Sequence, residues 1–125
     1  STEIVGVQSV GAPAYALSFA AGHVVTTERA ETRADGMATR VPDPAALAII
    51  RAGAARIVTV SDDEVAAAIR AYWQDTHNLA EGAGAAPLAA LMQDGAAMRG
   101  RRVGLVLCGG NIDLDLFRDW VLGEA

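Results

Sequence analysis

Short apolar runs alternate with stretches of helical periodicity along most of this chain, and this alternation limits the possible folds more than any other feature. Apolar runs predict strands at 4–8, 56–60 and 103–108, and a shorter one at 23–26. Strands that alternate with helices are typical of parallel βαβ units, and strands apolar along their whole length indicate a sheet covered on both faces. We therefore expect a single α/β domain over residues 1–125, with an open, mostly parallel sheet flanked by helices.

Capping residues mark where the helices begin. Asp43 followed by Pro44 predicts a helix over 45–52, because a carboxylate caps the free N–H groups and proline suits the first turn. The run 61–64, Ser-Asp-Asp-Glu, is a capping box. We interpret that run as helix capping and not as a functional motif. Its helix should continue to about residue 77. Further helices are predicted at 14–21, 85–93 and 113–122, the last with an apolar face of Leu114, Phe117 and Val121, and 27–40 is predicted to be a loop with one helical turn.

Composition excludes several classes of function. All ten basic residues are arginine, so the chain has no lysine side chain for a covalent bond to a carbonyl cofactor. The net charge of −5 argues against a nucleic-acid partner, and no apolar run approaches the roughly 18 residues of a membrane span. The single cysteine, Cys108, indicates a reducing compartment, which is the cytoplasm by default. His23 and His77 lack partners at ligand spacing, so no metal site is predicted.

The carboxyl ends of the predicted strands 4–8 and 103–108 are candidate ligand positions, because ligands of open parallel sheets gather there. The first leads into the segment 8–12 (Gln-Ser-Val-Gly-Ala). The segment Cys108 to Asn111 begins at the last residue of the predicted strand 103–108, and its two glycines would let the backbone approach a ligand closely. The alternative is a tight turn with a buried cysteine. Glu81 lies among small residues in the break 78–84, where its carboxylate is either solvated or directed into a site. From the residues alone we predict half of a ligand site and no particular reaction.

Four stretches, in this order and at these separations, resemble one family. They are 34–38 (Ala-Asp-Gly-Met-Ala), 58–64 (Val-Thr-Val-Ser-Asp-Asp-Glu), 76–85 (Thr-His-Asn-Leu-Ala-Glu-Gly-Ala-Gly-Ala) and 106–113 (Val-Leu-Cys-Gly-Gly-Asn-Ile-Asp). Together they resemble the C-terminal part of the catalytic region of pyridoxal-phosphate-dependent threonine/serine dehydratases, which have fold type II. The likeness extends over roughly residues 4–122.

The resemblance implies a cofactor site and a reaction. Cys108 stands where these dehydratases place a serine or cysteine facing the pyridine nitrogen of pyridoxal phosphate. A thiol does not force protonation of that nitrogen, as an aspartate would. Glu81 stands at the position of the acid near the cofactor ring, and Gly109, Gly110 and Asn111 would form the adjacent wall. The implied reaction is β-elimination of water from threonine or serine, which gives a 2-oxo acid and ammonia.

The chain also departs from the family pattern. The cofactor-binding lysine and the glycine-rich phosphate loop of these enzymes would precede Ile4. We therefore expect a fragment matching the last third of a catalytic region, without a regulatory domain. Alone, it should neither bind pyridoxal phosphate covalently nor convert threonine. Related racemases bind a divalent cation through acidic side chains. In this chain the corresponding positions are Gln8 and Ala14, which are not acids, so the resemblance does not extend to that metal site.

Two alternatives stay open. Within the same family the chain is compatible with serine racemase or another fold-type-II lyase. From a different class, it is compatible with a stand-alone binding or interaction module that retains the fold without the chemistry. Because a fragment exposes surface that its missing part would cover, we also expect self-association.

Overall fold

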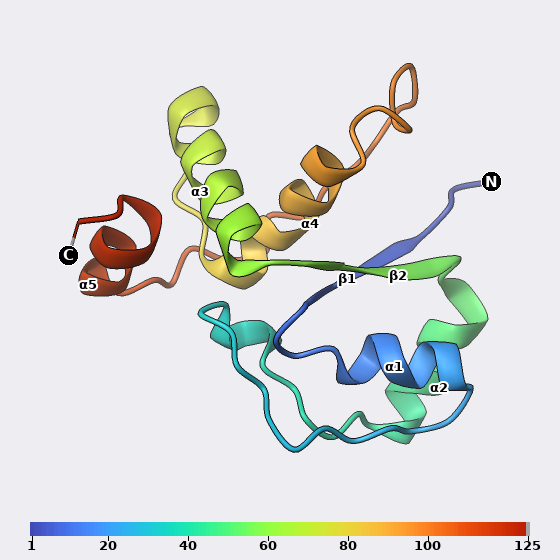
Figure 1. The fold of residues 1–125 in the computed structure, drawn as a ribbon. Coiled ribbons are helices and arrows are strands. Elements are labelled where there is room, and N and C mark those ends of the chain that lie inside the picture. Colours follow the sequence, from blue (N-terminus) through green and yellow to red (C-terminus); the bar gives the residue numbers. More distant parts are fainter. Residues whose placement is uncertain (125) are drawn as a thin grey trace.

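A computed structural model describes residues 1–124 and shows a two-stranded parallel sheet with helices on both sides (Figure 1). The elements are β1 Val5–Ser9, α1 Ala14–Ala21, the 3₁₀ turn η1 Asp35–Met37, α2 Pro44–Gly53, β2 Arg56–Val60, α3 Asp62–Thr76, α4 Gly82–Gln93, the single turn α5 Leu114–Leu116 and the π-helical turn η2 Phe117–Val121. Val7 of β1 lies opposite Val58 of β2. Helices α1 and α2 lie on one side of the sheet, and α3 and α4 lie on the other (Figure 1). The predicted fold class, an α/β layer built on parallel strands, is confirmed.

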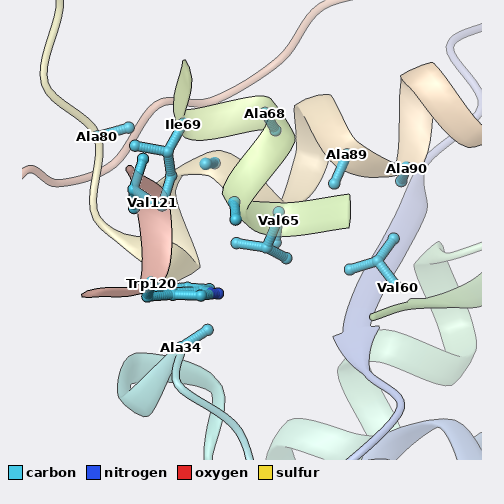
Figure 2. Close-up of a cluster of buried hydrophobic side chains, with 13 residues drawn as sticks. Ala34, Val60, Val65, Ala68, Ile69, Ala80, Ala89, Ala90, Trp120 and Val121 are labelled. Atoms are coloured by element: carbon cyan, nitrogen blue, oxygen red, sulfur yellow. The ribbon is translucent and has the colours of Figure 1, made fainter. Parts of the chain in front are cut away.

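The hydrophobic core lies on the α3 and α4 side of the sheet (Figure 2). Ile69 and Val65 of α3 are fully buried against the small side chains of α4, which include Ala85 and Ala89. Alanine at these positions allows the two helices to approach closely. Val60, at the end of β2, joins the sheet to this cluster. The core therefore surrounds the start of α3 and α4, where the loops that carry the predicted site residues meet.

The predicted helix starts are confirmed by their capping bonds. The Asp43 side chain accepts a hydrogen bond from the Ala46 N–H at 2.9 Å, with Pro44 at the first helical position. In the capping box, the Ser61 hydroxyl accepts from the Glu64 N–H at 3.2 Å, and the Glu64 carboxylate accepts from the Ser61 N–H at 2.7 Å. Helix α4 begins at Gly82, three residues before its predicted start at residue 85.

The capping box makes stability depend on pH. The hydrogen bond from the Ser61 N–H is the main cause that holds the pKa of Glu64 below its ordinary value of 4.5, against the opposing effect of partial burial. A lowered folded-state pKa contributes stability above the unfolded-state value, and this is lost as pH falls through the folded-state pKa. We expect Glu64→Gln to destabilise the chain near neutral pH, with the difference from wild type shrinking as pH falls below about 4. Denaturant unfolding over a pH series measures this, and a difference that stays constant with pH would contradict it.

Two predicted strands are wrong. The described residues form one sheet, of β1 and β2 only. At 23–26, the Val25 N–H donates to the buried Ser18 hydroxyl at 2.8 Å, and that hydroxyl donates to the Ala14 carbonyl at 2.7 Å. The Val25 N–H is therefore not available to a neighbouring strand. At 103–108 the backbone exchanges no hydrogen bond with residues 1–124. An apolar composition favours a strand, but no described strand lies beside this segment to pair with it.

The C-terminal helix is present in a different form. The predicted helix 113–122 is a single α-turn followed by the π-helical turn η2. A π turn has more residues than an α turn, so it changes which side chains share a face. Of the predicted apolar face, Val121 is buried and Phe117 is half-buried, whereas Leu114 is exposed. Trp120, which was not predicted to lie on that face, is buried. Within residues 1–124, every helix is too short or too polar to cross a lipid bilayer.

Candidate functional site

The predicted site residues come together at the start of α4. Glu81 directly precedes this helix, and its N–H donates a hydrogen bond to the Gly109 carbonyl at 3.0 Å. The segment Cys108 to Asn111 therefore lies across the turn that leads into α4. Glu81 is partly buried, and Cys108, Gly110 and Asn111 are exposed. The buried-cysteine alternative is wrong, because the thiol lies at the surface.

Glycines allow this close approach. A β-carbon on Gly110 would lie 2.5 Å from the Leu79 carbonyl oxygen, which is backbone and cannot move aside. A β-carbon on Gly84 would lie 2.6 Å from the Gly109 carbonyl oxygen. Real β-carbons do not approach other atoms this closely. These glycines therefore bring the two segments of the chain against each other, a role that the sequence analysis had assigned only to contact with a ligand.

The loop 27–40 reaches the same place. Ala34 is almost fully buried and lies against Gly82, the first residue of α4. Gly36, in η1, faces Ala83 so closely that a β-carbon on it would be 2.9 Å from the Ala83 β-carbon. Three of the four stretches that carry the family resemblance thus meet around residues 81–84.

Asp62 is a residue of this region that the sequence analysis missed. Its side chain does not cap α3; it accepts hydrogen bonds from the Thr32 hydroxyl at 2.5 Å and from the Arg33 N–H at 2.8 Å. The sequence held a sign of this role, namely two acids inside the capping box that the cap does not use. A capping box uses only Ser61 and Glu64, which left the intervening acids without a stated partner.

Comparisons with known proteins identify the family of this chain. Residues 1–109 match the family model described as pyridoxal-phosphate dependent enzyme. The chain belongs to this family. It is 39% identical over 111 residues to an L-threonine ammonia-lyase from Geobacter sulfurreducens, a match covering 89% of this chain and 28% of that protein. It is 33% identical over 98 residues to the beta-hydroxyaspartate dehydratase of Paracoccus denitrificans, covering 78% of this chain and 31% of that protein.

Solved structures share the fold. The processed form of threonine deaminase isoform 2 from Solanum lycopersicum matches with a TM-score of 0.88 at 27% identity, over 99% of this chain and 36% of that one. Maize serine racemase matches with a TM-score of 0.82 at 26% identity, over 98% of this chain and 39% of that one. The chain thus spans about a third of the length of the relatives it matches, and its fold corresponds to a part of theirs.

Among residues 1–124, no three His, Cys, Asp or Glu side chains are grouped as a metal ion would need. An apolar cavity of about 420 Å³ lies on the α1 and α2 side of the sheet, with Ile49, Ile57 and Tyr15 in its lining. Neither Glu81 nor Cys108 lines this cavity. We therefore place the candidate site at the start of α4 and not at the cavity.

Proposed function

We propose that the chain supplies part of the cofactor site of a threonine/serine dehydratase, an ammonia-lyase that forms a 2-oxo acid and ammonia. The observation that carries this proposal is the meeting of Glu81 with the Cys108 segment, in a chain that belongs to a pyridoxal-phosphate dependent family. Bound pyridoxal phosphate supplies an electron sink for the amino-acid carbon skeleton. The proposed cofactor-binding residues are Cys108, Gly109, Gly110, Asn111 and Glu81.

The residues present fit one side of this cofactor. Cys108 is exposed, and the hydrogen bond from the Glu81 N–H to the Gly109 carbonyl fixes the backbone of its segment against the start of α4. A thiol in that position is a weak hydrogen-bond partner for a ring nitrogen and does not force protonation of it. Asn111, also exposed, offers an amide beside it. These groups would orient the ring without a covalent bond to it.

Covalent attachment needs a residue that this sequence does not contain. All ten basic residues are arginine, so no side-chain amine is present to form the bond. We expect that pyridoxal phosphate followed by borohydride labels no side chain of the purified 125-residue chain. Peptide mapping by mass spectrometry is the measurement, and a labelled side chain would contradict the assignment.

The activity is tested on the product of the natural reading frame that encodes this chain. We expect it to form 2-oxobutyrate from threonine or pyruvate from serine. Cys108→Ser should keep most of this activity, because a hydroxyl is also a neutral partner. Cys108→Asp should reduce kcat by at least about tenfold, because a carboxylate favours a protonated ring nitrogen. Formation of no 2-oxo acid from either substrate overturns the proposed function.

Serine racemase is the second candidate, and the similarity to the maize enzyme favours it. Chiral analysis of serine recovered from the same assay separates the two. Accumulation of D-serine at a rate above that of pyruvate would assign racemization as the main reaction.

We further infer that residues 1–125 are one domain of a cytoplasmic protein. The domain assignment is supported by a single buried cluster that draws on residues from Ala34 to Val121. The location is supported by the presence of one cysteine only.

We also propose self-association through the segment 103–108. Its backbone is free of hydrogen bonds to residues 1–124, and Val106 is 71% exposed. Unpaired backbone with exposed apolar side chains favours pairing with a strand of another chain. Light scattering should give a mass above the 12.9 kDa of one chain, and Val106→Lys should lower it. Val41→Lys is the control, because Val41 is similarly exposed but lies in another loop. A monomer at high concentration overturns the proposal.

A further inference from the structure

Asp62 connects α3 to the loop that lies under α4. Its Oδ1 atom accepts from the Thr32 hydroxyl, and its Oδ2 atom accepts from the Arg33 N–H. Both carboxylate oxygens are therefore used by the loop 27–40. Ser61 and Glu64 already complete the cap of α3, so Asp62 is not needed for that purpose.

The loop 27–40, which Asp62 holds, contacts the start of α4. The Thr32 hydroxyl also accepts from the Ala34 N–H at 3.1 Å, which fixes Ala34 relative to Asp62. Ala34 lies in direct contact with Gly82, since a β-carbon on Gly82 would be 2.7 Å from the Ala34 α-carbon. Gly82 follows Glu81 in the chain. The position of Glu81 thus depends on where Asp62 holds the loop.

A second contact from Asp62 reaches the same glycine. The indole N–H of Trp120 donates to the Asp62 carbonyl at 3.1 Å. The ring of Trp120 lies between Ala34 and the helices (Figure 2), and its edge would be 2.9 Å from a β-carbon on Gly82. Asp62 therefore contacts both of the elements that pack against Gly82: its side chain binds the loop that carries Ala34, and its carbonyl binds Trp120.

We propose that Asp62 is a positioning residue for the candidate site. By fixing Ala34 and Trp120 against Gly82, it sets the position of Glu81 and, through the bond from the Glu81 N–H to the Gly109 carbonyl, the position of the Cys108 segment. The value of this to catalysis rests on the proposed function, whereas the coupling itself does not. The competing explanation is that Asp62 only interacts with the helix dipole, as any acid in the first turn does.

Asp63 provides the matched control. It is the next residue in the same first turn and is exposed, with no side-chain hydrogen bond to residues 1–124. Asp63→Asn therefore removes the same charge from the helix start as Asp62→Asn. Asp62→Asn additionally replaces two charge-assisted acceptors with one neutral acceptor oxygen, and its NH₂ group can only donate, so at most the Thr32 hydroxyl could take it as a partner. Thr32→Val removes the hydroxyl alone and keeps the volume of the side chain, so it decides the question if Asp62→Asn does not fold.

The measurement is hydrogen exchange of the Glu81 amide in the purified chain without cofactor. Asp62→Asn and Thr32→Val each weaken a hydrogen bond to the charged Asp62 position. We expect this to raise the exchange rate of the Glu81 amide by about tenfold or more. Exchange of the Ile69 amide, inside α3, should stay at the wild-type rate, as should Glu81 exchange in Asp63→Asn. A general loss of stability would raise the Ile69 rate by the same factor.

The proposal is overturned if Glu81 exchanges equally fast in the Asp62→Asn and Asp63→Asn variants, or if Glu81 and Ile69 accelerate together. Because no cofactor is present, this result is independent of the proposed function. Unchanged exchange removes the positioning role whatever the enzyme assays find. Faster exchange at Glu81 alone supports that role even where the reading-frame product forms no 2-oxo acid.

Discussion

Replacing Trp120 with alanine is expected to lower the free energy of unfolding by about 3 to 5 kcal/mol. Only 8% of Trp120 is exposed, and it fills the space between Ala34 and the core helices (Figure 2). Truncation removes the apolar area of the ring and leaves a cavity. The residues around this cavity belong to packed helices and can relax into it only in part. It also leaves the Asp62 carbonyl without the indole donor. Urea unfolding followed by circular dichroism measures the change, since fluorescence would lose one of its two reporters.

Trp73 is the matched control for this change. It is on α3 but 51% exposed, and its ring lies 6.2 Å from that of His77 at a tilted angle. Trp73→Ala should therefore cost no more than about 1 kcal/mol, as substitutions at exposed positions usually do. Equal losses for the two variants would mean that Trp120 is not the packed residue that the structure shows.

Trp120 also illustrates what the sequence could and could not predict. The predicted apolar face of the last helix included Leu114 and omitted Trp120, because it was based on α-helical spacing. The π-helical turn changes that spacing, and its last residue is contacted from far along the chain, since the Arg70 side chain donates to the Val121 carbonyl at 2.7 Å. By contrast, the starts of α2 and α3 depend on residues within one turn, and both were predicted.

The same distinction applies to the strands and to the site. The segment 103–108 has the composition of a strand, but pairing depends on a neighbour that local sequence cannot supply. Glu81 and Cys108 were candidates from their places along the chain, but only the resemblance implied a role for each, since spacing left those roles open. Asp62 was missed because the whole run 61–64 was assigned to helix capping, although the capping box itself uses only Ser61 and Glu64. Its partners, Thr32 and Arg33, lie about thirty positions away in the loop. Contacts of that kind are set by packing and not by local pattern.

Gly82→Ala is the second change with a large expected effect. Alanine is the better helix former by about 1 kcal/mol, so a purely local argument predicts stabilisation. In the structure its β-carbon would lie 2.7 Å from both the α-carbon and the β-carbon of Ala34. Neither atom belongs to a flexible side chain that can move aside. We expect a net loss of about 1 to 3 kcal/mol in the free energy of unfolding, as overpacking of a core typically causes.

Gly53→Ala separates steric overlap from helix propensity. Gly53 is also helical, at the end of α2, and a β-carbon there would have no atom within 4 Å. This variant should be stabilised by about 0.5 to 1 kcal/mol. Combining Gly82→Ala with Ala34→Gly removes the contact between the two β-carbons but keeps the one with the Ala34 α-carbon, so rescue should be partial and the two changes non-additive. Additive losses would mean that Gly82 is not in contact with Ala34, and the link from Asp62 to Glu81 would then lack its middle step.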